Sequence, residues 1–260
     1  PAVLFSKGGY VSVPVVAAAK GICPVLTHES DYTPGLANKI DAHFANKVLV
    51  TFADTVPLVS GNKGVHTGTP IRRELYGGSR ERGLAFLGFS GEKPIILVMG
   101  GSLGATALND GVRAALPELG KKFDIVHLCG KGKLDESVVS PAYRQYEYIS
   151  AELPDILAAT DLVVSRSGAN AVFEFLALKK PALFIPLPLE ASRGDQILND
   201  AAERGEIDAL GPFIGLRRAR GDQDVECFHR VEVRAHRGQL LAAVFQRHRH
   251  AAGHRAAQLH

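Results

Sequence analysis

The chain has 260 residues, of which 46% are hydrophobic and 22% charged, and its formal net charge is +3. This composition is typical of a globular α/β protein and excludes a chain that is disordered throughout. The charge is small, and no dense basic stripe precedes residue 215, so nucleic-acid binding is not indicated. No apolar run approaches the roughly 18 residues that span a bilayer. The three cysteines form no CxxC pair, which favours a reducing compartment without disulfides.

The first 76 residues predict a repeated pattern of a buried strand, a loop and a helix. We expect strands at 3–5, 24–26, 47–52 and 64–67, and helices at 10–20 and from residue 36. The segment 77–92 is rich in glycine and shows no clear period, so we predict a linker there, after the remaining part of an N-terminal domain at 1–76. No initiator Met and no element precede the first strand, so we expect the chain to start inside a domain.

The pattern restarts at Lys93 and predicts a second domain at 93–205. We expect strands at 95–99, 123–128, 148–149, 161–164 and 182–185, and helices at 105–116, 153–158, 169–180 and 195–203. Strands and helices that alternate with short connections predict an α/β fold with a parallel, doubly wound sheet.

The segment 206–260 differs from everything before it. It holds nine arginines and six of the ten histidines, whereas all twelve lysines lie at or before Lys180. Three hypotheses account for this: a functional basic tail, a metal-binding histidine tract, and a stretch that is disordered or translated out of its ancestral frame. Scattered histidines without fixed ligand spacing argue against a metal site. We favour the third hypothesis.

One stretch, Asp161 to Pro181, carries the clearest chemistry. An apolar strand ends at Val164, a turn of small residues follows, and a helix then carries a single acid, Glu174. Such a turn presents unpaired backbone N–H groups and the positive end of a helix dipole to an anion, and Glu174 can accept hydrogen bonds from hydroxyls. A phosphate and a sugar diol are the ligands that suit this arrangement. The structural alternative for Glu174 is an ordinary surface acid, although its neighbours are apolar.

A second turn, Gly100 to Gly104, also lies between a buried strand and a helix, which is the context of a phosphate-binding loop. It lacks the GK[ST] ending of a Walker loop, and tight packing alone would also explain its glycines. Arg72 is a candidate phosphate clamp or an exposed arginine at a domain edge. Asp195 and Gln196 either reach sugar hydroxyls or, in the case of Asp195, cap a helix.

His28 and Glu29 end a predicted strand at the edge where open α/β sheets place ligand residues. They are the candidate catalytic pair, a base and its orienting carboxylate, or else a structural ion pair. Adjacent residues of an extended strand point to opposite faces, so a direct dyad requires the chain to turn there. No loop predicted in residues 1–205 contains two aspartates with the DxD spacing that binds a divalent metal ion, so the sequence does not indicate a metal site there.

Six short sequence motifs, which follow one another between residues 1 and 205, resemble those of the MurG type of bacterial glycosyltransferase. Enzymes of this type add N-acetylglucosamine to the lipid-linked muramyl-pentapeptide precursor of peptidoglycan. These motifs are FSKGGYVSVPVVAAA (5–19), HESDYTPGLANK (28–39), GTPIR (68–72), GGSLGA (100–105), SRSGANAVFE (165–174) and RGDQILN (193–199). Each motif alone is a weak indication of the family, but the order of all six and their positions between strands and helices are specific to it.

The resemblance implies the GT-B fold, with two Rossmann-like domains, the N-terminal one incomplete here, and an inverting displacement that needs no metal or other cofactor. It implies UDP-N-acetylglucosamine as donor, the undecaprenyl-diphosphate-linked muramyl-pentapeptide (lipid I) as acceptor, and peripheral binding to the cytoplasmic face of the cell membrane. Glu174 would hold the ribose, whereas Arg72 and the Gly100 loop would hold the diphosphate. The residues implied in donor binding are Arg72, Gly101, Ser102, Gly104, Arg166, Ser167, Gly168, Ala169, Glu174, Asp195 and Gln196.

Two departures from the resemblance bear on activity. The histidine-containing glycine loop that opens the family's N-terminal domain, a candidate base, has no counterpart after Pro1, and residues 206–260 do not match the family's last region. We therefore expect the chain as written to be nearly inactive. Two alternatives stay open: a fragment that binds UDP-sugars without catalysis, and a related GT-B transferase with another lipid acceptor.

Overall fold

The computed structural model describes residues 1–101, 105–185, 214–215, 231–234 and 240–243. The chain divides into two units, Pro1–Gly215 and Leu216–His260. In the second unit, β11 (Val231–Arg234) and β12 (Leu240–Ala243) form an antiparallel pair in which Val231 is opposite Ala243. These strands lie in the segment that the sequence predicts to be disordered or out of frame. The remainder of the unit lies outside the described residues.

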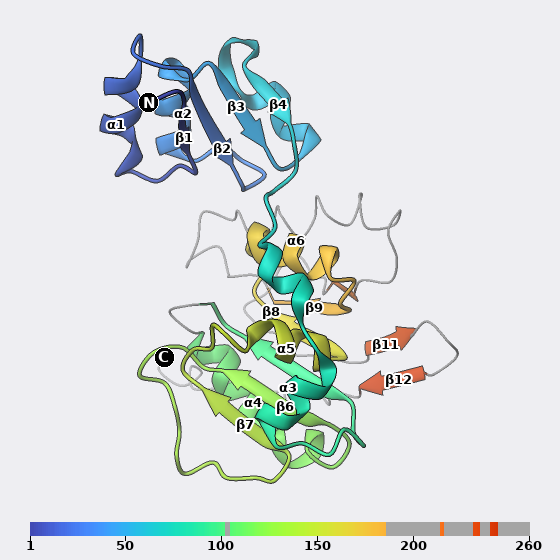
Figure 1. The fold of residues 1–260 in the computed structure, drawn as a ribbon. Helices are drawn as coiled ribbons and strands as arrows, with labels where there is room; N and C mark the ends of the chain where they lie inside the picture. Colours follow the sequence, from blue (N-terminus) through green and yellow to red (C-terminus); the bar gives the residue numbers. More distant parts are fainter. Residues whose placement is uncertain (102–104, 186–213, 216–230, 235–239, 244–260) are drawn as a thin grey trace, which may run out of the picture. The chain divides into compact units, whose positions relative to one another are not determined.

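The first parallel sheet of Pro1–Gly215 has the strand order β1-β2-β3-β4 (Figure 1). Its strands are β1 (Leu4–Ser6), β2 (Val25–Glu29), β3 (Lys47–Val50) and β4 (Gly64–His66); its helices are α1 (Ser12–Ala19), α2 (Leu36–Phe44) and the short 3-10 turns η1 (Ala53–Leu58) and η2 (Ser60–Asn62). Its core contains Val16 of α1 together with Val25, Val48 and Val50 of the strands. The strands and helices predicted for this part of the sequence therefore pack together through their Val and Ala side chains.

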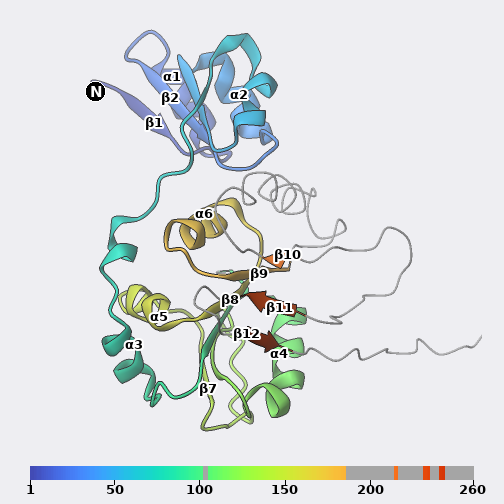
Figure 2. The same ribbon diagram turned by 90° about the vertical axis from the view of Figure 1, so that its right-hand side faces the viewer.

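The second parallel sheet has the order β10-β9-β8-β5-β6-β7. Its strands are β5 (Ile95–Met99), β6 (Asp124–Leu128), β7 (Tyr143–Tyr146), β8 (Leu162–Ser165), β9 (Ala182–Phe184) and β10 (Ile214–Gly215); its helices are α4 (Thr106–Leu119), α5 (Leu153–Ala159) and α6 (Ala169–Ala177). Helix α4 covers one face of this sheet and α5 the other (Figure 2). The predicted α/β fold with parallel sheets is confirmed.

The chain reverses its direction across this second sheet. From β5 it proceeds outward to β6 and β7, and it then returns to place β8 on the other side of β5. The neighbouring strands β5 and β8 therefore connect to helices on opposite faces. Such a switch point is where open α/β sheets bind their ligands, at the carboxyl ends of the strands.

Two elements differ from the sequence prediction. The strand expected at 148–149 is instead β7, at Tyr143–Tyr146. β7 is an edge strand in which only Tyr143 is buried. Its sequence, YRQY, therefore has no apolar run that would predict a strand. The glycine-rich segment 77–92 contains a helix, α3 (Arg80–Leu87), which begins at the Ser79 cap and ends at Gly88 in the left-handed conformation (φ 66°).

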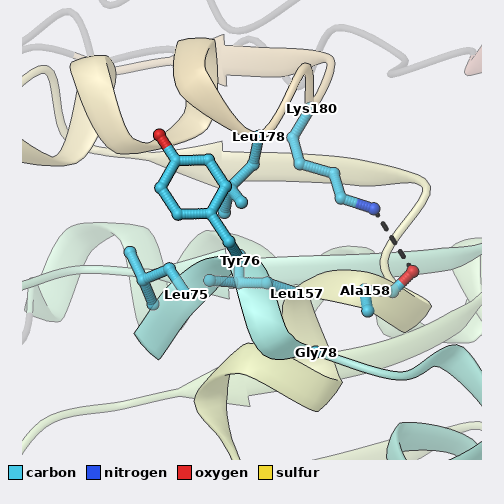
Figure 3. Close-up of a pocket in the computed structure, with 7 residues that line it drawn as sticks. All are labelled: Leu75, Tyr76, Gly78, Leu157, Ala158, Leu178 and Lys180. Atoms are coloured by element: carbon cyan, nitrogen blue, oxygen red, sulfur yellow. Dashed lines mark hydrogen bonds between the residues drawn. The ribbon is translucent and has the colours of Figure 1, made fainter. Parts of the chain in front are cut away.

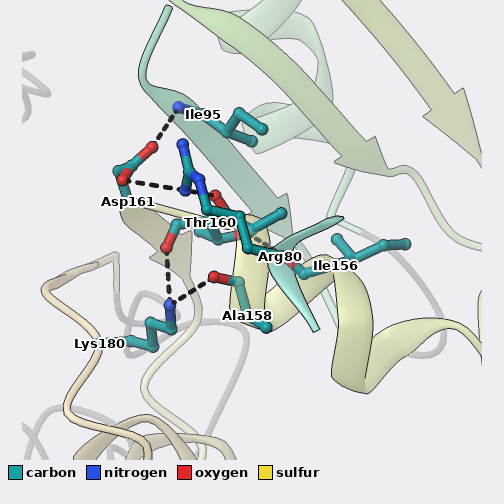
Figure 4. A network of polar contacts seen from close by, with 8 residues as sticks. Arg80, Ile95, Ile156, Ala158, Thr160, Asp161 and Lys180 are labelled. Atoms are coloured by element: carbon teal, nitrogen blue, oxygen red, sulfur yellow. Dashed lines mark hydrogen bonds and ion pairs between the residues drawn. The ribbon is translucent and has the colours of Figure 1, made fainter. Parts of the chain in front are cut away.

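Helix α3 packs against α5 and is fixed there by polar contacts at the end of α5. The 3-10 turn η3 (Arg73–Gly77) precedes α3, and its Leu75 joins the core of the second sheet. Arg80 of α3 donates to the carbonyl of Ala159 (2.6 Å). Figure 4 shows Lys180 donating to the carbonyls of Ala158 and Thr160. Both cations thus satisfy carbonyl groups that a helix end leaves unpaired.

Gly83 of α3 lies close against the backbone of α5. A Cβ atom built at Gly83 would overlap the carbonyl group of Asp155, whereas a Cβ atom at Gly111 in α4 would meet nothing within 4 Å. Alanine favours a helix over glycine by about 1 kcal/mol at either position. We expect overpacking to dominate at Gly83, so that Gly83→Ala lowers the free energy of unfolding by about 1–3 kcal/mol.

The matched variant Gly111→Ala has no such overlap, and we expect it to raise the free energy of unfolding by up to about 1 kcal/mol. Urea unfolding of both variants, followed by circular dichroism, measures the two effects. Stabilisation by Gly83→Ala would contradict the close approach of α3 and α5.

A buried polar network fastens α4 to β6 and β7. His127 of β6 has no exposed surface; its Nε2–H donates to Asn109 Oδ1 (3.0 Å), and its Nδ1 accepts from the hydroxyl of Tyr143 (2.8 Å). Asn109 of α4 in turn donates to the carbonyl of Cys129 (2.9 Å). Burial lowers the pKa of His127 to about 4 and raises that of Tyr143 to about 12. The histidine is therefore neutral at physiological pH, with both ring nitrogens paired.

Candidate donor site at the switch point

The two turns predicted to bind an anion start side by side. Met99 at the end of β5 is in register with Ser165 at the end of β8, so the loops that follow leave the same edge of the sheet from neighbouring strands. Gly101 has a φ of +86°, which is the left-handed region that favours glycine. Two predicted residues of this loop, Ser102 and Gly104, lie outside the described residues.

The turn after β8 leads directly into α6. Ser165 and Ser167 are buried, and burial lowers the pKa of the Arg166 guanidinium. Gly168 is extended at the N-cap position of α6, where its carbonyl accepts from the amide of Val172 (3.1 Å). The first N–H groups of a helix have no partner within the helix, so the start of α6 at Ala169 is suited to an anionic oxygen.

Glu174 forms a two-pronged ion pair with Arg72. Arg72 Nε donates to Glu174 Oε1 (2.8 Å), and Arg72 Nη2 donates to Glu174 Oε2 (3.1 Å). These hydrogen bonds raise the pKa of Arg72 further above its usual value. The Glu174 side chain is only 17% exposed, compared with 53% for Arg72. The structure thus brings together two predicted donor ligands that are far apart in the sequence.

Asn170 shares the face of α6 that carries Glu174, and two further residues, Lys7 and Thr69, contact it there. The sequence does not single out any of the three. Asn170 lies one turn before Glu174, and its Oδ1 accepts from Lys7 Nζ (3.3 Å) and from Thr69 Oγ1 (3.2 Å). Burial lowers the pKa of Lys7, and the charge of Glu174 partly opposes that shift. The spacing of four residues between Asn170 and Glu174 is the signal that identifies their common face. Lys7 lies in the motif FSKGGYVSVPVVAAA and Thr69 in the motif GTPIR, both of which resemble MurG-type sequences.

The candidate catalytic residues His28 and Glu29 are buried in β2, with 1% and 4% of their surface exposed. His28 Nε2–H donates to the carbonyl of Gly68 (3.0 Å), and burial lowers the pKa of the ring. Glu29 accepts from Asn38 Nδ2 (2.8 Å) and from the backbone amides of Asp31 and Gly35. These contacts hold the loop after β2 in place, and a catalytic role for either residue stays a prediction.

Asp195 and Gln196 are outside the described residues. A pocket of about 220 Å³ beside η3 and α5 is lined by Tyr76 and Lys180 but by none of the predicted donor ligands (Figure 3). Within the described part of the chain, no three His, Cys, Asp or Glu side chains gather as a metal would need. No helix described by the structure is long and apolar enough to cross a membrane.

Comparison with known proteins decides the family. The glycosyltransferase family 28 C-terminal domain matches residues 95–203, and the glycosyltransferase family 28 N-terminal domain matches residues 1–50. A Bacillus cereus UDP-N-acetylglucosamine–N-acetylmuramyl-(pentapeptide) pyrophosphoryl-undecaprenol N-acetylglucosamine transferase is 61% identical over 201 residues, which are 76% of this chain and 57% of the relative. The chain belongs to glycosyltransferase family 28.

Two further comparisons agree with this result. The transferase of the same name from Clostridium botulinum is 53% identical over 212 residues, 81% of this chain and 59% of the relative. The crystal structure of Acinetobacter baumannii MurG has a TM-score of 0.57 and 26% sequence identity, and the match covers 78% of this chain and 57% of that one. The chain therefore has the GT-B fold of family 28 and spans somewhat over half the length of the relatives it matches.

Proposed function

We propose that this chain carries the donor site of a transferase that moves N-acetylglucosamine from UDP-N-acetylglucosamine to the lipid-linked muramyl-pentapeptide of peptidoglycan synthesis. The observation that carries the proposal is the register of Met99 with Ser165, which starts both anion-ready turns at the switch point. The 61% identity to a transferase of this name supports the donor and acceptor.

The proposed reaction is a single displacement at the anomeric carbon. The 4-hydroxyl oxygen of the muramyl sugar forms the new bond while the bond to the UDP oxygen breaks, and the hydroxyl proton passes to a base. Negative charge develops on the departing diphosphate. We expect the N–H groups at the start of α6, the Gly101 loop and the Arg72 guanidinium to stabilise that charge, and we expect Glu174 to accept hydrogen bonds from the ribose hydroxyls.

The full chain, incubated with radiolabelled UDP-N-acetylglucosamine and a lipid-linked muramyl-pentapeptide, tests this function. Because the sequence predicts a nearly inactive chain, we expect only a small fraction of the label to move into the lipid fraction, and we expect Glu174→Gln to reduce that transfer further. Binding of UDP without transfer would instead support the alternative, UDP-sugar binding without catalysis. Absence of both binding and transfer would contradict the proposal.

We also propose that the first sheet binds the membrane surface peripherally at the cytoplasmic face, because the acceptor is a lipid. Apolar side chains at and before α1 support this: Tyr10, Val11 and Val15 have 85%, 66% and 54% of their surface exposed. An apolar helix face of this kind can lie in the headgroup region.

The double change Val11→Asp with Val15→Asp tests the membrane contact, because it places charge on the apolar face of α1. We expect this variant to sediment less than the unaltered chain with vesicles of an anionic phospholipid. Val139→Asp is the matched control, since Val139 is 87% exposed in a loop of the second domain. Equal sedimentation of all three proteins would count against the membrane contact.

A further inference from the structure

Two residues proposed to bind different parts of the nucleotide bind each other in this structure. The Glu174 carboxylate, assigned to the ribose hydroxyls, accepts two hydrogen bonds from the Arg72 guanidinium, assigned to the diphosphate. Parallel hydrogen bonds of this fork geometry are stronger and more specific than a single contact. Both oxygens of the carboxylate are therefore engaged by Arg72.

The pair is held by one hydrophobic core rather than by chance contact between flexible side chains. Arg72 immediately precedes η3, whose Leu75 is 3% exposed, and Glu174 immediately precedes Phe175, which is 1% exposed. Leu75 and Phe175 belong to the same core cluster beneath the second sheet. The backbone positions of Arg72 and Glu174 are therefore fixed relative to each other by packing.

We propose that the Arg72–Glu174 pair makes the site selective for nucleoside diphosphates by occupying the ribose-binding carboxylate until a diphosphate draws the guanidinium away. The inference rests on the proposed donor site. UDP supplies a new partner to each member of the pair, because its diphosphate accepts from Arg72 and its ribose donates to Glu174. A nucleoside without phosphate supplies only the second, so it must break the ion pair without replacing the contact that Arg72 loses.

The test is equilibrium dialysis of the full chain with radiolabelled uridine and, separately, UDP. We expect Arg72→Ala to tighten uridine binding about two- to fivefold, the range for loss of an ion pair with one exposed partner. The same change is expected to weaken UDP binding about tenfold or more, because charge-assisted hydrogen bonds to the diphosphate are lost. Opposite effects on the two ligands distinguish competition within the site from general damage.

Arg82→Ala is the matched control. Arg82 forms the same two-pronged contact with Asp155 (2.7 and 3.0 Å), but on α3, and its loss is expected to change neither affinity. In a Glu174→Gln background, Arg72→Ala is expected to leave uridine affinity unchanged, since no ion pair remains to be broken.

The outcomes separate this inference from the proposed function. If the unaltered chain fails to bind UDP, the donor site itself is wrong. If UDP binds and is weakened by Arg72→Ala, but uridine binding is unchanged, weakened or undetectable in that variant, the donor site stands and the selectivity role of the ion pair is overturned.

Discussion

Glu174→Gln is expected to weaken UDP binding about tenfold. A carboxylate that accepts hydrogen bonds from hydroxyls contributes more than a neutral amide, about 1.5–3 kcal/mol, which corresponds to a tenfold or larger change in the dissociation constant. Part of that loss is offset, because Arg72 no longer has to leave Glu174 before it contacts the diphosphate. Isothermal titration of the full chain with UDP measures the change.

The control for this prediction is Glu118→Gln. Glu118 also lies on a helix and pairs with a cation, Lys121 (2.7 Å), but its side chain is 79% exposed and lies in the last turn of α4, at the end opposite the Gly101 loop. We expect its UDP affinity to match that of the unaltered chain. An equal affinity of Glu174→Gln and Glu118→Gln for UDP would remove Glu174 from the donor site.

Acid is expected to destabilise the second sheet through His127. Between about pH 6.5 and pH 4 the unfolded chain takes up a proton on this histidine, whereas the folded chain keeps it neutral because burial lowers its pKa to about 4. The unfolded state thus binds more protons, so the free energy of unfolding falls as the pH falls through that window. The difference in pKa corresponds to about 3 kcal/mol.

Urea unfolding at pH 7.5 and at pH 4.5 measures this loss, and a histidine variant isolates it from the contribution of the carboxyl groups. His127→Gln should be less stable than the unaltered chain at pH 7.5 but should lose less stability on acidification. His43→Gln, on the exposed face of α2, should retain the full pH dependence. If His127→Gln and the unaltered chain lose the same stability, protonation of His127 does not drive the acid effect.

The elements that the sequence predicts well are those whose signal is local. The continuous apolar run from Ile95 to Met99 forms the central strand β5, and the glycines after it mark the loop that follows. The sequence does not predict helix α3, because Gly83 interrupts its apolar spacing and Gly88 ends it after two turns. Those glycines are needed for close contact with α5 and for the end of the helix, and neither need is visible without the partner helix.

For the candidate site, sequence reasoning identifies residue types and not their pairing. Arg72 and Glu174 were each predicted to bind the nucleotide, but 102 positions separate them, and no local pattern indicates that they form an ion pair. The sequence does not single out Asn170, because an amide near the start of a helix is an ordinary surface residue. Its contacts with Lys7 and Thr69 depend on how distant segments pack together.

The core of the second sheet extends upstream of the first strand of that sheet, and this has a consequence for dissecting the protein. Leu75, Leu87 and Phe89 precede β5 but belong to the same cluster as Phe175. A recombinant piece cut at residue 93 would lose these three side chains and Arg72 as well. An autonomous donor half must therefore be expressed from a start point before Arg72, even though the strand and helix repeat begins later.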